Sequence, residues 1–197
     1  FIGTRQYLER DHRLFHHYLR TALQVNENRI QVFKNPHPAD WAATLSSIED
    51  MYGQGSLFVY ISGFATVRNG EILLSSDEEF IQTPLEVIFE SLKQSRPERM
   101  YVFVDVDYQP ETAQYESNTR TNGYRSVLQQ TADVILQDAP NAIVVFSSMP
   151  NQSSSLYTGQ SGENKRHSIF NYYLADALKK KNSEISDLIQ HLQNNVD

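Results

Sequence analysis

A chain of 197 residues, of which 40% are hydrophobic, can form one folded domain or at most two small ones with a substantial core, so the composition excludes a disordered chain. The net charge of −7 excludes nucleic acid as a default partner, because no basic surplus exists to neutralise phosphates. The chain has no cysteine, which excludes disulfides, thiolate metal sites and a cysteine nucleophile but leaves the compartment undetermined.

Short apolar runs bounded by turn residues predict five strands, because such runs are typical of buried strands. In chain order they cover residues 30–33, 57–61, 71–74, 100–104 and 142–146. The second run is expected to stop at Ser62-Gly63, and Asn69-Gly70 predicts a tight hairpin turn. The opening residues Phe1-Ile2-Gly3 look like the tail of a further strand, so we expect a domain truncated at its N-terminus. No apolar run reaches the roughly 18 residues of a membrane span, and no membrane partner is expected.

Apolar residues at helical spacing predict helices between and after these strands. These segments cover residues 11–23, 40–51, 84–93, 126–136, 168–181 and 183–192. The alternation predicts a single α/β domain over residues 1–197, a three-layer sandwich with a mostly parallel central sheet and helices on both faces. Two polar stretches, 108–124 and 150–166, are expected to be loops beyond the carboxyl ends of strands, where open α/β sheets place their ligands.

The segment Tyr60-Ile61-Ser62-Gly63-Phe64-Ala65 resembles a motif of the caspase and metacaspase family of cysteine peptidases. In that family, a strand ending in Tyr-x-Ser-Gly is followed by His-Gly, and the His is paired with a catalytic cysteine. Phe64 stands at the histidine position. A second apolar strand of the family ends in Asp-Ala-Cys, whereas this chain has Asp105-Val106-Asp107, so Asp107 stands at the cysteine position.

Other segments extend the resemblance over nearly the whole chain. The Asn69-Gly70 hairpin with the strand after it and the segment 142–148 are similar to successive parts of the family fold. The segment 168–178 closely resembles the family's Phe-Thr-x-x-Leu-x-x-Ala-Leu helix, and residues 1–7 look like the end of its first strand. The resemblance therefore implies a caspase-like fold.

The two substitutions argue against the family's chemistry. A cysteine peptidase needs a thiolate beside an imidazole, and phenylalanine can neither accept nor donate a proton. Aspartate is a poor nucleophile towards a peptide and has no imidazole here to activate it. We therefore expect a catalytically inactive domain, a pseudo-peptidase, with Phe64 and Asp107 as its degenerate site.

Two other kinds of site remain open. Asp105 and Asp107 lie two residues apart at a strand end and could chelate Mg²⁺ or Ca²⁺ together with Asp77 or a loop carboxylate. Alternatively, a serine could act with one of the six histidines, but no Gly-x-Ser-x-Gly elbow is present and Gly159-Gln160-Ser161-Gly162 has the wrong spacing. His167 is interpreted as a residue that precedes a helix, and His12, His16 and His17 as a solvated helix face.

The sequence thus predicts a peptide- or protein-binding regulatory or scaffold domain, and the alternative is a hydrolase with an unrecognised nucleophile or a carboxylate-bound metal. Its expected partner is a protein or peptide, such as an active homologue or further domains of a larger chain, and no cofactor or metal is expected. The candidate site comprises Ser62, Gly63, Phe64, Asp105, Asp107, Ser147 and Ser148.

Overall fold

The fold is taken from a computed structural model of the chain, which divides into two compact units. The first unit combines Phe1–Val32 with Ser154–Asp197, and the second is Phe33–Ser153. The structure describes residues 2–34, 55–75, 82–109, 120–150, 152, 156–157, 167–180 and 185–196. The predicted helix at 40–51, Asp77 and the segment 159–162 lie outside these residues. A single domain over residues 1–197 stays a prediction.

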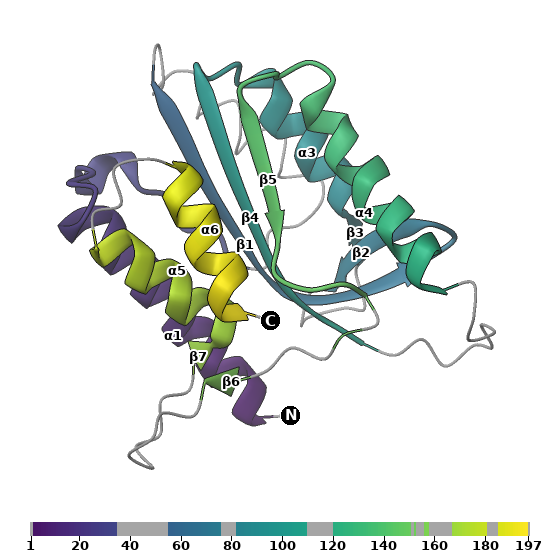
Figure 1. The fold of residues 1–197 in the computed structure, drawn as a ribbon, viewed down its shortest axis with the longest axis horizontal. Coiled ribbons are helices and arrows are strands. Elements are labelled where there is room, and N and C mark those ends of the chain that lie inside the picture. The colour runs from purple at the N-terminus through teal and green to yellow at the C-terminus, as the bar shows by residue number, and fades with distance from the viewer. Residues whose placement is uncertain are drawn as a thin grey trace. The chain divides into compact units, whose positions relative to one another are not determined.

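The second unit is built on a five-stranded sheet with the order β3-β2-β1-β4-β5 (Figure 1). The strands and helices of this unit are β1 (Ser56–Arg68), β2 (Glu71–Ser75), β3 (Gln82–Pro84), α3 (Leu85–Gln94), β4 (Arg99–Tyr108), α4 (Arg120–Leu136) and β5 (Ala142–Phe146). Strand β4 pairs in parallel with both β1 and β5, whereas β2 pairs antiparallel with both β1 and β3. The fold is therefore α/β, as predicted.

The predicted mostly parallel sheet is wrong, because the sheet is mixed. The antiparallel half comes from the Asn69-Gly70 turn, which sends the chain straight back along β1. Both turn residues have positive φ angles, 53° for Asn69 and 83° for Gly70, as a two-residue hairpin turn requires. The hairpin itself was predicted correctly.

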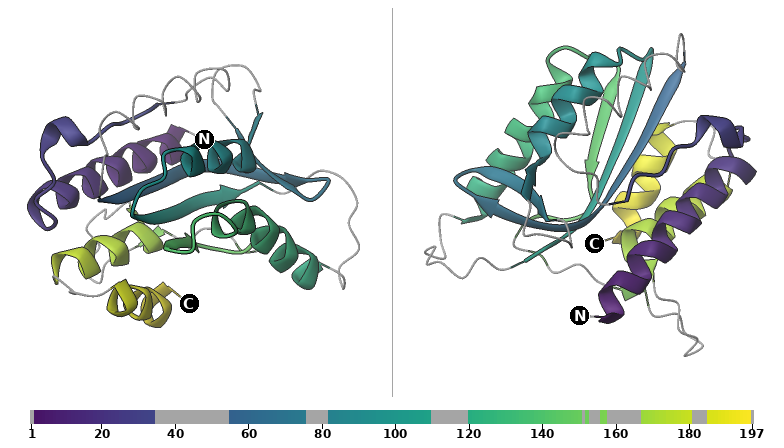
Figure 2. Two further views of the ribbon diagram at one scale, coloured as in Figure 1. Left: turned by 90° about the horizontal axis from the view of Figure 1, so that it is seen from above. Right: turned by 180° about the vertical axis from the view of Figure 1, so that it is seen from behind.

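Helices α3 and α4 pack side by side on one face of this sheet (Figures 1 and 2). The core between helices and sheet takes alternate residues of the central strands, such as Leu57 and Ala65 of β1 and Val102 and Val106 of β4. Phe89 of α3 is fully buried within it. Period-two alternation along a strand places the intervening residues on the opposite face. The described helices of this unit thus form one layer on the sheet, and the predicted third layer is not established.

The two central strands are longer than the sequence predicts. β1 was expected to stop at Ser62-Gly63 but continues to Arg68, and β4 was expected to span only residues 100–104 but continues to Tyr108. Their parallel pairing extends from Ser56↔Arg99 to Ala65↔Tyr108. Each strand therefore keeps its ladder hydrogen bonds through the polar residues at its carboxyl end. As a result, Phe64 and Asp107 lie within strands.

The first unit is mainly helical and joins the two ends of the described chain. Its elements are α1 (Ile2–Thr21), η1 (Glu27–Arg29), β6 (Leu156–Tyr157), β7 (His167–Ser168), α5 (Ile169–Lys179) and α6 (Ile185–Val196). Helix α5 contacts both α1 and α6 (Figure 1). Phe15 of α1, Leu174 of α5 and Leu192 of α6 are buried. The predicted helices at 11–23, 168–181 and 183–192 are confirmed, with shifted ends.

Two predicted strands are wrong. Ile2 and Gly3 belong to α1 and not to the tail of a strand, because a single helix runs from Ile2 to Thr21. Residues 30–33 pair with no described strand, and Val32 and Phe33 stay 52% and 37% exposed. An isolated extended segment gains no ladder hydrogen bonds, so apolar residues alone do not make it a strand. The loop predicted at 108–124 is also too long, since α4 begins at Arg120.

Within the part of the chain that the structure describes, no helix is long and apolar enough to cross a membrane.

Candidate functional site

The predicted site residues gather where β1 and β4 run side by side towards their carboxyl ends. The parallel register places Phe64 opposite Asp107 and Ser62 opposite Asp105. Register partners of adjacent strands point to the same face of a sheet. Their chain neighbours Ala65 and Val106 belong to the core beneath α3 and α4, so these four residues lie on the face away from those helices. We call Ser62, Phe64, Asp105 and Asp107 the strand-end site.

Gly63, also predicted for the site, does not share this face. It pairs with Val106, a buried residue on the helix-covered side. A Cβ atom built on Gly63 would have no heavy atom within 4 Å beyond its chain neighbours. Gly63 therefore separates Ser62 from Phe64 along the strand without contributing to the face that carries them.

Asp105 is anchored from within the same face. The Tyr60 hydroxyl donates a hydrogen bond of 2.9 Å to Asp105 Oδ2. Asp105 is only 5% exposed, whereas Asp107 is partly exposed. A buried carboxylate needs hydrogen-bond donors, and the phenol is one of them. Asp105 is thus a fixed structural group, and Asp107 is the more accessible of the two acids.

The same face becomes aromatic towards the amino ends of the strands. Phe58 stacks on its register partner Tyr101, with ring centroids 4.7 Å apart and an angle of 29° between the ring planes. One step further, Tyr60 pairs with Phe103, which is 1% exposed. The strand-end site therefore forms the polar end of a face whose other end is aromatic.

Ser147 and Ser148 follow β5 at the adjoining strand end. The Ser147 amide donates a 2.9 Å hydrogen bond to the carbonyl of Val104 on β4. This bond extends the β4–β5 pairing one step beyond Phe146. The Ser148 hydroxyl is buried and has no hydrogen-bond partner among the described residues. Both serines thus lie at the same sheet edge as the strand-end site.

The chemistry available at the strand-end site is limited. It offers a serine hydroxyl, two carboxylates and a phenyl ring, with no thiol and no imidazole. Among the described residues, no three or more histidine and acidic side chains are grouped so that they could hold a metal ion. Asp77, which the metal interpretation requires, lies outside those residues, so that interpretation stays untested.

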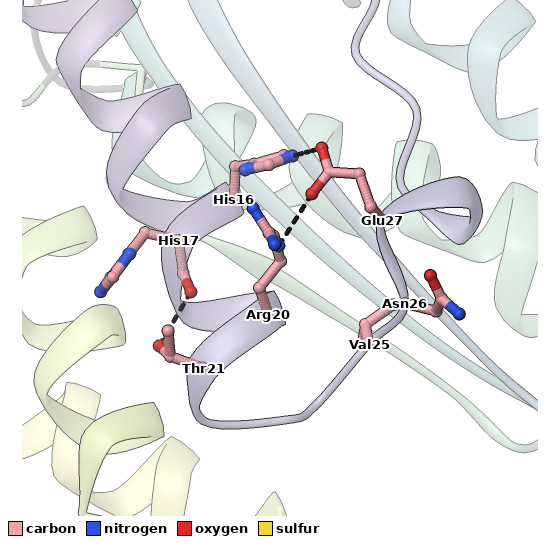
Figure 3. A pocket seen from close by; sticks show the side chains of 7 residues that line it. All are labelled: His16, His17, Arg20, Thr21, Val25, Asn26 and Glu27. Carbon is pink, nitrogen blue, oxygen red and sulfur yellow. Dashed lines mark hydrogen bonds and ion pairs between the residues drawn. The ribbon is translucent and has the colours of Figure 1, made fainter.

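A surface hollow in the first unit was not predicted (Figure 3). It has a volume of about 520 Å³ and lies between the last turns of α1 and residues 25–27. The Glu27 carboxylate contacts two side chains of α1 there, with Oε1 3.2 Å from His16 Nε2 and Oε2 2.7 Å from Arg20 Nε. The His17 ring points away from Glu27. The hollow is therefore occupied by an internal ion pair, and His16 is not simply the solvated residue that helical spacing indicated.

The structure also contains a buried acid–histidine pair that was not predicted. Asp11 Oδ1 lies 2.6 Å from His167 Nδ1, although 156 positions separate the two residues. His167 was interpreted only as a residue preceding a helix. No local pattern could reveal its partner, because that partner comes from a helix at the other end of the chain.

No family model matches the sequence, and no curated protein matches it significantly.

Proposed function

We propose that the chain is a caspase-like domain, catalytically inactive as a peptidase, that binds a peptide or protein segment at its strand-end site without cutting it. One observation carries the proposal. Phe64 and Asp107, which occupy the positions of the family's histidine and cysteine by resemblance, are direct register partners on one sheet face. Adjacent strands lie about 4.8 Å apart, so side chains at register partners on one face are neighbours.

The residues at these positions support binding rather than turnover. An activated thiolate is replaced by a carboxylate, and the proton-transferring imidazole is replaced by a ring that cannot titrate. Because the two catalytic groups of such a pair act as a unit, losing both leaves only binding effects. Phe64 provides an apolar contact and Asp107 an accessible charge and hydrogen-bond acceptor.

The expected partner is a segment of an active homologue, another domain of a longer chain, or a free peptide. The alternative function is a hydrolase that uses a carboxylate-bound metal or an unrecognised nucleophile. The two functions differ in the role of Asp107. In a binding domain it contributes affinity, whereas in the alternative hydrolase its loss stops turnover.

A peptide panel tests the proposal. Fluorogenic peptides with acidic, basic and apolar residues are titrated with and without calcium, and hydrolysis and thermal shift are recorded on the same samples. We expect at least one peptide to raise the melting temperature without hydrolysis. Phe64→Ala and Asp107→Ala should remove that shift, whereas Val87→Ala, at a side chain on α3 that is 43% exposed, should preserve it.

Hydrolysis that Asp107→Ala abolishes would overturn the proposal in favour of the alternative hydrolase. A shift that survives both site variants would place peptide binding elsewhere on the chain.

A further inference from the structure

The Asp11–His167 pair has the geometry of a base and its orienting carboxylate. Asp11 Oδ1 accepts a hydrogen bond of 2.6 Å from His167 Nδ1, and Oδ2 accepts one of 3.1 Å from the Ser168 backbone amide. The Asp11 side chain is 1% exposed and that of His167 is 23% exposed. The carboxylate is therefore sealed within the first unit, whereas the imidazole reaches its surface.

Two hydrogen-bond donors surround the Asp11 carboxylate. Both carboxylate oxygens accept hydrogen bonds, and donors aimed at a carboxylate stabilise its charge. One of the donors, the Ser168 amide, belongs to the residue that caps α5, so the carboxylate also lies at the positive end of that helix. Asp11 can therefore compensate a positive charge that develops on the imidazole.

The hydrogen bond to Asp11 also fixes the tautomer of His167. A carboxylate only accepts hydrogen bonds, so Nδ1 carries a proton, and in the neutral imidazole Nε2 then carries the lone pair. Among the described residues, Nε2 has no hydrogen-bond or ion-pair partner. An imidazole that is oriented by a carboxylate and partly exposed is the arrangement that removes protons from water or hydroxyl groups in catalysis.

We propose that His167 is a general base for hydrolysis of small activated esters, with Asp11 as its positioning residue. The attacking nucleophile is water. As the water oxygen bonds to the ester carbonyl carbon, Nε2 takes a water proton. As the bond from carbon to the leaving oxygen breaks, Nε2 returns that proton to the leaving oxygen. The products are a carboxylic acid and an alcohol. This site belongs to the first unit and does not depend on the strand-end site of the second.

Turnover of p-nitrophenyl acetate tests the proposal, with circular dichroism confirming that each variant is folded at the assay temperature. We expect His167→Gln to lower the second-order rate constant by about tenfold or more, because a positioned base contributes strongly to such reactions. Residual turnover comes from the other histidines, of which the chain has six in all. The control His17→Gln, at an exposed histidine of the same unit, should change the rate by less than about twofold.

Labelling of the unmodified chain gives an independent test that needs no variant to fold. Limiting diethyl pyrocarbonate carbethoxylates imidazole nitrogens in proportion to their nucleophilicity and access. His17 is more exposed than His167, so exposure alone predicts faster labelling of His17. We expect His167 to be labelled faster, as measured by peptide mass spectrometry over time.

Asp11→Asn separates positioning from mere packing. The amide NH₂ group can donate to Nδ1, which moves the ring proton to Nε2, so labelling of His167 should slow. Simple loosening of the pair would expose His167 and speed its labelling. The proposal is overturned if His167→Gln costs no more activity than His17→Gln, if His17 is labelled first, or if Asp11→Asn accelerates labelling of His167.

Discussion

Two tyrosines of the second unit differ in whether their hydroxyl groups are paired. The Tyr108 hydroxyl is buried and has no hydrogen-bond partner among the described residues, whereas the Tyr60 hydroxyl donates to Asp105. Removing an unsatisfied buried hydroxyl relieves a desolvation cost, but removing one bonded to a carboxylate loses a strong hydrogen bond. We expect Tyr108→Phe to keep or raise the unfolding free energy, by up to about 1 kcal/mol, and Tyr60→Phe to lower it by about 1–2 kcal/mol. Urea denaturation at neutral pH measures both, and equal effects of the two variants would contradict the assignment.

Burial of the Tyr108 hydroxyl should also make the stability of the chain depend on pH in the alkaline range. Burial raises the pKa of the Tyr108 phenol above its ordinary value, because the ionised form is desolvated. The folded chain therefore holds the phenol proton more tightly than the unfolded chain does. The resulting contribution to the free energy of unfolding is fully present below the unfolded-state pKa, about 10, and is lost as the pH rises further. The wild-type chain should therefore lose stability relative to Tyr108→Phe above about pH 10. Melting temperatures of the wild type and of Tyr108→Phe, measured from pH 8 to 11, check this. If the two curves run parallel, burial of Tyr108 has no such effect.

The facing positions of Phe64 and Asp107 can be tested by restoring the pair that the resemblance implies. The chain has no cysteine, so Asp107→Cys introduces its one thiol. Adding Phe64→His places an imidazole on the facing position, and a nearby imidazolium lowers the pKa of a thiol. We expect the double variant to react with iodoacetamide at pH 6 at least about tenfold faster than Asp107→Cys alone.

A matched control uses a neighbouring position with the opposite orientation. Ala65 lies next to Phe64 on β1 but faces the buried core, so Ala65→His with Asp107→Cys should give no acceleration. If that control accelerates the reaction equally, the two predicted site residues do not face one another as the register indicates.

The sequence could indicate that Phe64 and Asp107 lie together at strand ends, but it could not reveal the acid–histidine pair. Phe64 and Asp107 each follow a short apolar run with recognisable neighbours, and parallel strands bring such ends together. Asp11 and His167 have no such local signal, because their contact depends on how α1 packs against the start of α5. Long-range side-chain pairs of this kind arise from tertiary packing and leave no periodic pattern in the sequence.

At the scale of the elements, Ser168 decides where α5 begins. Its hydroxyl accepts a 3.0 Å hydrogen bond from the Asn171 amide, which satisfies one of the unpaired donors of the first turn. We expect Ser168→Ala to lower the unfolding free energy of the first unit by about 1 kcal/mol. The control Ser91→Ala should stay within about 0.5 kcal/mol, because its hydroxyl only donates back to the Val87 carbonyl inside α3. Hydrogen exchange of α5 and α3 amides in the full chain measures the two effects, and comparable losses would argue against a special role of the cap.

Lys93 joins two elements of the second unit. Its Nζ lies 2.9 Å from Glu90 Oε2 in the same helix and 2.9 Å from Asp138 Oδ2 in the segment after α4. Hydrogen bonds to these two carboxylates raise the pKa of Lys93 above its ordinary value. The stability that they contribute is fully present below the unfolded-state pKa, about 10.4, and is lost as the pH rises through the folded-state value. Lys93→Met should therefore melt below the wild type at pH 8 and converge with it at strongly alkaline pH.

The control for this prediction is Lys180→Met, which removes an exposed pair with Asp176 within the first unit. Exposed pairs of this kind contribute little. A larger loss of melting temperature in Lys180→Met than in Lys93→Met would contradict the linking role of Lys93.

Helices were predicted more reliably than strands, for a physical reason. A helix satisfies its own backbone, so apolar periodicity in 84–93 and 168–181 was enough to locate α3 and α5. A strand depends on its neighbours, so the apolar residues 30–33 form none, while β1 and β4 continue through polar residues because each pairs with the other. The mixed sheet follows from the same dependence, since one two-residue turn reverses β2.

At the scale of the whole molecule, each compact unit has buried apolar residues of its own. The core beneath α3 and α4 uses residues between Leu57 and Phe146, all within the second unit. The first unit buries residues of α1, α5 and α6, drawn from two separate parts of the chain. A unit assembled from two chain segments depends on contacts between them, of which the Asp11–His167 pair is one.

Core truncations in each unit should therefore act mainly within that unit. Phe89 and Leu174 are both fully buried, the first in the second unit and the second in the first unit. Leu→Ala and Phe→Ala changes at such positions cost about 2–5 kcal/mol, through lost burial and the cavity left behind. In the full chain, Leu174→Ala should accelerate hydrogen exchange in α1, α5 and α6 more than in β4, and Phe89→Ala should do the reverse. Each variant is the control for the other. Equal acceleration of all elements by both variants would show that the two units unfold together.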